Sequence, residues 1–147
     1  IKEAEKMISG CLNNIYRRDD TVYKLALSVN EYLNLNNFLR IIKGGTALFR
    51  VRNSDISPLH DLAVSSLIKN EAFVKYDMDY YQALSFLRRE NFVLNDLGAG
   101  WILVRYSGVN IGFVKNIGAR INNYYPVEWR IRLNNESISP ERIVNWE

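Results

Sequence analysis

A predicted β-hairpin in the last third of the chain constrains its fold more than any other segment. Residues 101–106 and 111–115 are rich in β-branched and aromatic side chains, and the turn formers of residues 107–110 separate them. Because successive side chains of a strand point to opposite faces, one face of this hairpin is expected to be apolar. The expected core residues on that face are Trp101, Leu103, Ile111 and Phe113.

Weaker signals for helices and strands precede this hairpin. Apolar residues at helical spacing predict helices, and β-branched or aromatic runs between turn formers predict strands. In the first half of the chain we expect a helix over 2–17, a strand over 21–27, a helix over 28–39 capped by Ser28, and two strands around a Gly-Gly turn over 40–52. A helix over 57–67 and a strand over 73–76 are expected to follow. The next helix is expected to be capped by Asp77 or Asp79 and to end at Arg88 and Arg89, before a strand over 92–94. Short strands interleaved with helices indicate an α+β fold with a mixed, barrel-like sheet.

The length and composition indicate one compact domain, or a subdomain packed on a larger one. The chain has 147 residues, of which 48% are hydrophobic, enough to bury a core. No segment approaches the roughly 20 apolar residues that a membrane span needs. The mixed-charge N-terminus also differs from a secretory signal. We therefore expect a cytoplasmic protein without a membrane partner.

The cysteine and histidine content argues against a metal site. Cys11 is the only cysteine, so neither an internal disulfide nor a thiolate zinc site can form, and we expect it to pack within a helix. His60 is the only histidine, and one histidine makes no three-ligand zinc site without several well-placed carboxylates. We interpret His60, which precedes Asp61 near a predicted helix start, as a structural residue.

The search for catalytic motifs is negative. Gly44 and Gly45 precede Thr46 without the spacer and the lysine of a phosphate-binding loop. The glycines of residues 108–112 lead into a strand, so they provide no helix N-terminus for a pyrophosphate. We assign no catalytic residue and no cofactor site to this chain.

Positive charge is concentrated in residues 101–132. This segment holds five basic residues, one acidic residue and six aromatic residues, a net charge of +4 against +3 for the whole chain. Cations release counterions from phosphates, and aromatic faces stack on unpaired bases, so the mixture fits RNA. The alternative is that the charges only keep the outer face of the sheet solvated. The basic residues are Arg105, Lys115, Arg120, Arg130 and Arg132.

A polar and aromatic loop before Pro126 follows the hairpin. It consists of Asn122, Asn123, Tyr124 and Tyr125. Amide and phenol groups read base edges and sugars. Asparagine and the residue before proline equally favour a rigid, irregular loop. Both interpretations stay open on the sequence alone.

Four segments follow one another in an order that is specific to one family. Residues 58–63 have the pattern Pro-x-His-x-Leu-Ala, and residues 83–88 follow an Ala-x-x-Tyr-Leu-Arg helix with Phe86 in place of the tyrosine. Residues 108–115 have the spacing Gly-x-x-x-Gly-x-x-Lys, and residues 123–126 the pattern Asn-x-Tyr-Pro. Together they resemble the C-terminal PUA-like domain of Fmu/Sun-type (RsmF-like) ribosomal RNA cytosine-C5 methyltransferases. Phe113 is a second departure, because the family often has tryptophan there.

The resemblance implies a fold and a role for the chain. It implies a PUA-like mixed β pseudo-barrel with flanking helices over residues 41–147, which docks substrate ribosomal RNA during rRNA processing. Residues 1–40 would form a helical or αβ subdomain, or the connection to a methyltransferase domain upstream in cis. That domain would bind S-adenosylmethionine, and its motifs do not occur in this sequence. The chain also begins at an isoleucine, so we expect a non-catalytic fragment of such an enzyme.

The resemblance also implies which residues contact RNA. The implied set on the hairpin, the loop and the basic end is Lys115, Arg120, Asn122, Asn123, Tyr124, Tyr125, Arg130 and Arg132. Other cations that extend the same basic face are Lys43, Arg50, Arg52 and Arg105. The alternatives are a protein–protein interaction module, whose late aromatic residues pack on the parent enzyme or another partner, and a stand-alone reader of modified nucleotides.

Overall fold

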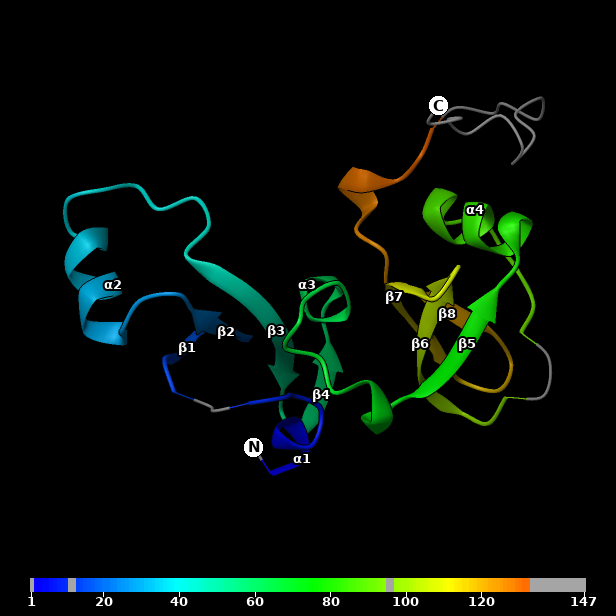
Figure 1. Ribbon diagram of the computed structural model, residues 1–147, viewed down its shortest axis with the longest axis horizontal. Helices are drawn as coiled ribbons and strands as arrows, with labels where there is room; N and C mark the ends of the chain where they lie inside the picture. The colour runs from blue at the N-terminus through cyan, green and yellow to red at the C-terminus, as the bar shows by residue number, and fades with distance from the viewer. Residues whose placement is uncertain (1, 11–12, 95–96, 133–147) are drawn as a thin grey trace, which may run out of the picture.

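The protein consists of two four-stranded sheets that lie side by side along the long axis of the molecule (Figure 1). The computed structural model describes residues 2–10, 13–94 and 97–132. Each sheet has its own helices, so the expected α+β class is confirmed.

The first sheet is antiparallel throughout and has the order β1-β2-β3-β4. Its strands are β1 (Ile15–Arg18), β2 (Thr21–Leu25), β3 (Gly45–Arg52) and β4 (Asp55–Pro58). The helices of this half are α1 (Lys2–Glu5), α2 (Val29–Asn36) and α3 (His60–Ala63). Figure 1 places α2 at the end of the molecule that is remote from the second sheet.

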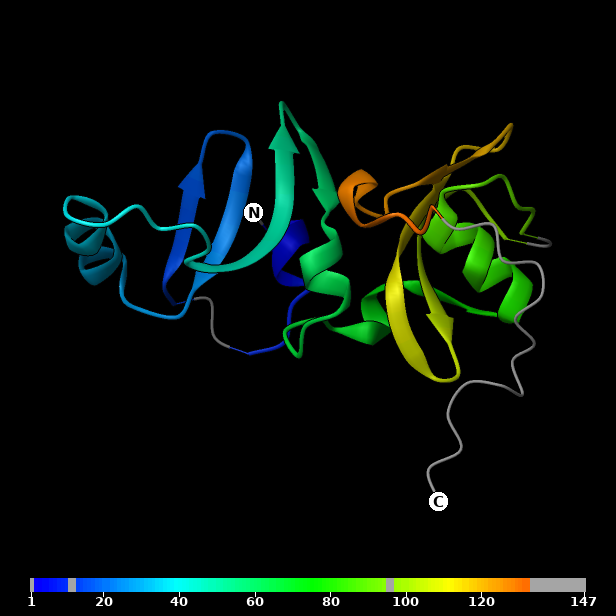
Figure 2. The ribbon, with the colours of Figure 1, turned by 90° about the horizontal axis from the view of Figure 1, so that it is seen from above.

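The second sheet is mixed and has the order β5-β6-β7-β8. Its strands are β5 (Val74–Met78), β6 (Gly100–Tyr106), β7 (Val109–Asn116) and β8 (Ile121–Asn123). The strands β5 and β6 are parallel, so the chain must cross over between them, and α4 (Tyr80–Arg88) lies on this crossover. Two short 3-10 helices, η1 (Asn70–Ala72) and η2 (Val127–Trp129), flank the sheet, and η2 lies between the two sheets (Figure 2).

The hairpin of β6 and β7 is buried on both of its faces. On one face, Leu103 and Phe113 join the core that contains Leu48 and Phe49 of β3. On the other face, α4 covers a second core. The members of that core on the hairpin are Ile102, Val104 and Val114. The antiparallel pairing and the position of Leu103, Phe113 and Trp101 at the first core confirm the prediction. The prediction is wrong for Ile111, which packs against the second core, and for the opposite face, which is not solvated because α4 packs on it.

Both predicted helix caps form. The Ser28 hydroxyl accepts a hydrogen bond from the Glu31 amide at the start of α2, and Asp79 accepts one from the Gln82 amide at the start of α4. In each case the third helical residue bonds back to the capping residue and completes a capping box. The helix α2 ends at Asn36, three residues before the predicted end, because asparagines interrupt it.

The prediction of a helix over residues 2–17 is wrong. The helix α1 ends at Glu5, and Gly10 adopts a φ of 88° that no helix continues. Residues 15–18 form β1, which pairs with β2 through a tight turn at Asp19. The spacing of apolar residues indicated a helix here, but cross-strand hydrogen bonds to β2 hold residues 15–18 in a strand. Cys11, which was expected to pack in this helix, lies outside the described residues.

The predicted pair of strands around Gly44 and Gly45 is also wrong. A Cβ on Gly45 would lie 2.2 Å from the Lys24 carbonyl oxygen, so this glycine permits β3 to approach β2 closely and does not form a turn. The turn of this hairpin lies instead at Asn53, which has a φ of 53°, between β3 and β4.

Three further expectations differ from the structure. The helix expected over residues 57–67 is limited to α3, because Pro58 ends the edge strand β4. Residues 92–94 form no strand, although Leu94 is buried in the second core. Neither sheet closes into a barrel within the described residues. The strand β8 has only three residues and pairs only with β7, so it does not reach β5.

The division of the chain at residue 40 stays a prediction. The strand β2, before this position, is hydrogen-bonded to β3, after it, so the first sheet draws on both sides of the expected boundary.

Replacing Gly112 by alanine is expected to destabilise the fold by about 3 kcal/mol. Gly112 has a φ of 152°, and a Cβ there would lie 2.6 Å from Cζ of Phe86, a fully buried ring. Gly118→Ala is the matched control, since Gly118 has a φ of 85° with open space around it. The control is expected to lose about 1 kcal/mol, from backbone strain alone. Urea unfolding of both variants measures the difference, and equal losses would contradict the role of the contact with Phe86.

Candidate functional site

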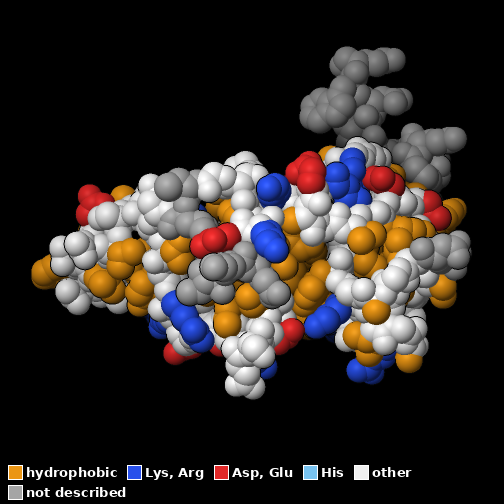
Figure 3. All heavy atoms as spheres, turned by 90° about the horizontal axis from the view of Figure 1, so that it is seen from below, with side chains coloured by type: hydrophobic (Ala, Val, Ile, Leu, Met, Phe, Trp, Pro, Cys, Tyr) orange, Lys and Arg blue, Asp and Glu red, His pale blue; other side chains and the backbone are white. Residues whose placement is uncertain are grey.

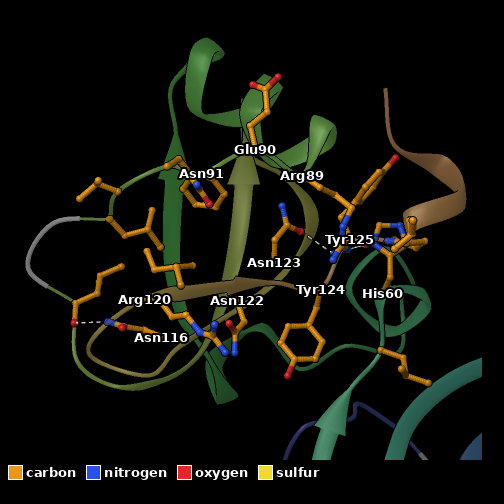
Figure 4. A pocket seen from close by; sticks show the side chains of 18 of the residues that line it. His60, Arg89, Glu90, Asn91, Asn116, Arg120, Asn122, Asn123, Tyr124 and Tyr125 are labelled. Carbon is orange, nitrogen blue, oxygen red and sulfur yellow. Dashed lines mark hydrogen bonds between the residues drawn. The ribbon is translucent and has the colours of Figure 1, made fainter. Parts of the chain in front are cut away.

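A groove with a cavity volume of about 1250 Å³ lies between the two sheets. One wall comes from β3 and the start of α3, through residues such as Arg50 and His60. The other wall comes from residues 89–94, from the β7–β8 turn and from residues 121–128 (Figure 4). The groove therefore exists only because the first and second sheets pack against each other.

The His60 ring lies on one wall of the groove and contacts aromatic rings of the other half of the molecule. Its ring meets the Tyr125 ring edge to face, with centroids 5.1 Å apart, and the Trp129 ring at 5.3 Å. Tyr125 packs in turn on Phe86 of α4 at 5.4 Å. Gly112 of β7 permits this assembly, because a Cβ there would lie 3.3 Å from Nδ1 of His60. The assignment of a structural role to the histidine agrees with this geometry.

Burial favours the neutral form of the His60 ring. Desolvation lowers the pKa of His60 below its ordinary value of 6.5, Asp61 opposes this effect, and Lys43 adds to it. The Nδ1 atom is buried and has no hydrogen-bond partner among the described residues, so a proton on it would be unsatisfied.

Asn123 ties the end of β8 to α4 and to its own loop. Its Nδ2 donates to the Phe86 carbonyl oxygen at 2.8 Å, and its Oδ1 accepts from the Tyr125 amide at 2.8 Å (Figure 4). Both polar atoms of the side chain are thereby used within the protein. This residue shapes the loop, and its amide is not available to a ligand.

The segment after Tyr125 is also held on α4. Arg89, which caps the C-terminal end of α4 with a φ of 60°, donates from Nη1 to the Tyr125 carbonyl oxygen. The Ile131 amide donates to the Leu87 carbonyl oxygen at 3.1 Å. The 3-10 helix η2 is thus held at both ends, and Trp129 is presented on it with 55% of its surface exposed.

A second aromatic pair lies at the base of the hairpin. The rings of Trp101 and Tyr124 are 4.5 Å apart, and Nζ of Lys115 lies 5.1 Å from the Trp101 ring centroid. The same Nζ is 3.7 Å from Asp55 of β4. The four late aromatic residues therefore divide into two groups, Trp101 with Tyr124, and Tyr125 and Trp129 with His60.

The structure brings together five of the eight residues of the implied RNA-binding set. Those that line the groove are Arg120, Asn122, Asn123, Tyr124 and Tyr125. Lys115 lies outside it, bound to Asp55. Arg130 and Arg132 are exposed on the segment that follows η2 and do not line the groove.

Each cation of the expected extension is paired with an acidic residue. Lys43 binds Asp61 at 2.9 Å, and Arg105 binds Asp77 at 3.4 Å. The remaining pairs are Arg50 with Asp20 at 3.7 Å and Arg52 with Asp20 at 2.8 Å. The hydrogen bond from Arg52 lowers the pKa of the Asp20 carboxyl, which agrees with a stable charged pair. Only Arg50 of this set lines the groove.

Several groove residues have polar groups that the protein itself leaves unused, and three of them belong to the implied RNA-binding set. Within the described part of the chain, the side chains of Arg120, Asn122 and Tyr124 make no hydrogen bond or ion pair. Figure 4 shows Arg120 and Asn122 next to each other beside β8, with Tyr124 further along the same wall. A ligand can engage these three side chains without breaking an internal hydrogen bond or ion pair among the described residues.

The groove is not uniformly basic. Its charged lining residues are Arg50, Arg89 and Arg120 against Asp61, Glu90 and Glu128. Figure 3 likewise shows basic side chains interspersed with acidic and apolar ones on one face of the molecule. A ligand must therefore be recognised through a few specific contacts, because bulk attraction between opposite charges is weak here.

Arg89 and Asn91 also line the groove, and neither was predicted as a site residue from the sequence. Arg89 was assigned only to the end of a helix. Its left-handed conformation, which turns the chain into the groove wall, is uncommon for a residue with a side chain and had no signal in the sequence.

The described part of the chain offers no alternative site for a metal ion. It holds no group of three or more histidine, cysteine or acidic side chains with the geometry of a metal site. Among the helices of the described residues, none has the length and apolar character needed to cross a membrane.

The second sheet is mixed and is covered by one helix, and a groove of amides, arginines and aromatic rings lies along its edge. These features are consistent with a PUA-like domain. Residues 73–131 match the family model of the methyltransferase RsmF PUA domain. The match confirms the resemblance that the later motifs indicated. The match does not include residues 40–72, which the resemblance also covered. No curated protein matches the chain.

The stability of the protein is expected to fall as the pH decreases from 7.5 to 5.5. The pKa of His60 is lowered in the folded state, so the unfolded chain binds the proton more readily. The contribution of the neutral His60 ring to the free energy of unfolding is complete above pH 6.5 and is lost as the pH falls through the folded-state pKa. His60→Gln, which does not titrate, is expected to show a flatter dependence in urea unfolding. An unchanged slope would contradict the assignment, since the chain has no other histidine.

Proposed function

We propose that this chain is the RNA-docking region of an S-adenosylmethionine-dependent ribosomal RNA (cytosine-C5) methyltransferase. The family of residues 73–131 indicates an RNA-binding role. The observation that carries the proposal is that three residues of the implied RNA-binding set, Arg120, Asn122 and Tyr124, line the groove with unused polar groups, on a wall that other residues hold in place. Rigid support lowers the entropic cost of binding, because the contacting groups are already in position.

Each of these three side chains has a distinct chemical use. The Arg120 guanidinium matches a phosphate, with which it can form two parallel hydrogen bonds. The Asn122 amide carries both donors and an acceptor, which is what a base edge requires. The Tyr124 ring is 37% exposed and backed by Trp101, so a base can stack on its free surface.

This combination favours unpaired nucleotides over a regular duplex. A duplex presents its phosphates outside and hides the faces of its bases, whereas an unpaired segment exposes both base faces and base edges. The groove has balanced charge, so affinity must come from stacking and hydrogen bonds as much as from counterion release. Its volume of about 1250 Å³ is sufficient for more than one nucleotide.

The proposed mechanism of this chain is positional. The groove binds a looped segment of ribosomal RNA and orients it, so that a cytosine is presented to a methyltransferase domain upstream in cis, in the cytoplasm. That domain would hold S-adenosylmethionine and carry out the methyl transfer. The residues of this chain bind and position the RNA, and none of them is assigned a step in the chemistry.

The first test is a salt titration of binding to a ribosomal RNA fragment that contains loops, with duplex DNA of equal charge as the control. Tighter binding to the RNA at every salt concentration would support the proposal. Equal binding to the two nucleic acids, or no binding to either, would contradict an RNA-docking role and favour the alternative of a protein–protein interaction module.

Arg120→Ala is expected to weaken binding of all RNA sequences alike and to reduce the slope of log K against log salt by about one. The reason is that one phosphate contact, and with it about one released counterion, is removed. Arg52→Ala is the matched control, because Arg52 is an exposed arginine already neutralised by Asp20 and lies outside the groove. Fluorescence anisotropy at several salt concentrations measures both slopes. A lower slope in the control variant, or an unchanged slope for Arg120→Ala, would remove Arg120 from the contact set.

Tyr124→Ala is expected to weaken binding of a single-stranded loop by about 1–3 kcal/mol while leaving binding of a duplex stem nearly unchanged. Asn122→Ala should weaken binding only to loops with the preferred base, since an amide reads base edges. Asn116→Ala provides a comparison, because both polar atoms of its side chain already bind the protein. An equal loss of affinity for loop and stem after Tyr124→Ala would contradict the assignment of a stacking surface.

A further inference from the structure

The end of the molecule farthest from the RNA groove carries an apolar patch that the proposed function does not use. Phe38 is 86% exposed and Ile42 is 96% exposed, in the segment between α2 and β3. Leu35 and Leu39, beside them in the sequence, are 40% and 59% exposed. Hydrophobic side chains are visible in Figure 3 at the end of the molecule that α2 forms. Large apolar side chains that are exposed together mark an interaction surface. We call these four residues the apolar patch.

A shallow depression of about 430 Å³ adjoins the apolar patch. The residues that line it are Arg18, Asn36, Leu39, Arg40, Ile41 and Ile42. Two of the patch residues, Leu39 and Ile42, therefore form part of its wall. A concave wall with aliphatic side chains accepts an inserted side chain, which a flat surface does not.

Two arginines of the depression have no acidic partner. Neither Arg18 nor Arg40 forms an ion pair within the described residues. Two acidic side chains of this half of the molecule, Asp20 and Glu31, are engaged elsewhere. Asp20 binds Arg50 and Arg52, and Glu31 binds Ser28.

Five other cations of the chain differ from these two arginines, because each has an acidic partner. Each of the cations Lys43, Arg50, Arg52, Arg105 and Lys115 forms an ion pair. The positive charge that remains beside the apolar patch thus attracts carboxylates from another molecule. Charge complementarity of this kind selects partners and fixes their orientation.

We propose that the apolar patch and Arg18 and Arg40 form a docking site for a protein segment that is acidic and amphipathic. One large apolar side chain of the partner fills the depression against Leu39 and Ile42. Carboxylates that flank this side chain pair with Arg18 and Arg40. Phe38, beside the depression, covers the remaining apolar surface of the partner.

A protein partner fits the observations better than RNA or a lipid bilayer. The patch is mostly aliphatic, and aliphatic side chains offer no π face for a base. A bilayer surface offers no side chain that fills a depression. This proposal does not depend on the RNA groove, which lies at the other end of the first sheet and has its own set of residues.

The test uses two fluorescent peptides with identical Leu and Phe residues at helical spacing, which differ only in carrying Glu or Lys at the remaining positions. The 147-residue chain is expected to bind the Glu peptide at least tenfold more tightly than the Lys peptide. The double variant R18E/R40E should invert this preference. The double variant F38S/I42S should weaken binding of the Glu peptide at least fivefold. Equal binding of the two peptides, or an unchanged preference in R18E/R40E, would overturn the proposal.

Three further measurements distinguish the loss of a docking site from unfolding and from other kinds of partner. The altered side chains are all exposed, so circular dichroism and thermal melting of both double variants should match the parent chain. Affinity for the ribosomal RNA fragment should be unchanged in F38S/I42S, and a loss there would assign the patch to RNA and overturn the proposal. Sedimentation with phosphatidylserine vesicles, or self-association in ultracentrifugation, that disappears in F38S/I42S would overturn it in favour of a membrane or a second copy.

Discussion

The structure depends on one hairpin, β6 and β7, that is buried on both faces. Leu103 and Phe113 join it to the first sheet, and Val104 and Val114 join it to α4. No position in the middle of this hairpin is free to face water, so its polar residues are confined to the strand ends, as with Arg105 and Lys115. The groove follows from this arrangement, because packing the hairpin between β3 and α4 brings the first and second sheets together along one edge.

Some residues around the groove hold its walls in place, and others leave their side chains available to a ligand. His60, Asn123 and Arg89 contact other parts of the protein and hold the loop after β8 in place. Arg120 and Asn122 use no internal partner among the described residues. This division separates two asparagines that are neighbours in the sequence motif. Asn122 and Asn123 are chemically identical, and only their contacts show that one is structural and the other is available.

Local signals predicted those elements whose stability is local. Ser28 and Asp79 cap their helices through hydrogen bonds to residues three positions later, and a turn between two β-branched runs produced the hairpin. Predictions failed where a distant partner decided the outcome. Gly45 was interpreted as a turn residue, but its role is set by the Lys24 carbonyl that it faces across the sheet. Residues 15–18 became a strand because β2 pairs with them.

The sequence by itself determined the α+β class, the central hairpin, the two helix caps and the family model that residues 73–131 match. The reason is that short-range hydrogen bonding and the order of motifs depend on positions along the chain. It also located the loop of residues 122–125, which forms part of one groove wall. Only the tertiary structure decided which cations remain available. Five predicted cations are paired with acidic residues from other elements or turns of the fold, as Lys115 is with Asp55, 60 positions away in the sequence. Charge counted along a chain does not reveal such pairs, since ion pairing acts over a few ångströms of space and not over sequence distance.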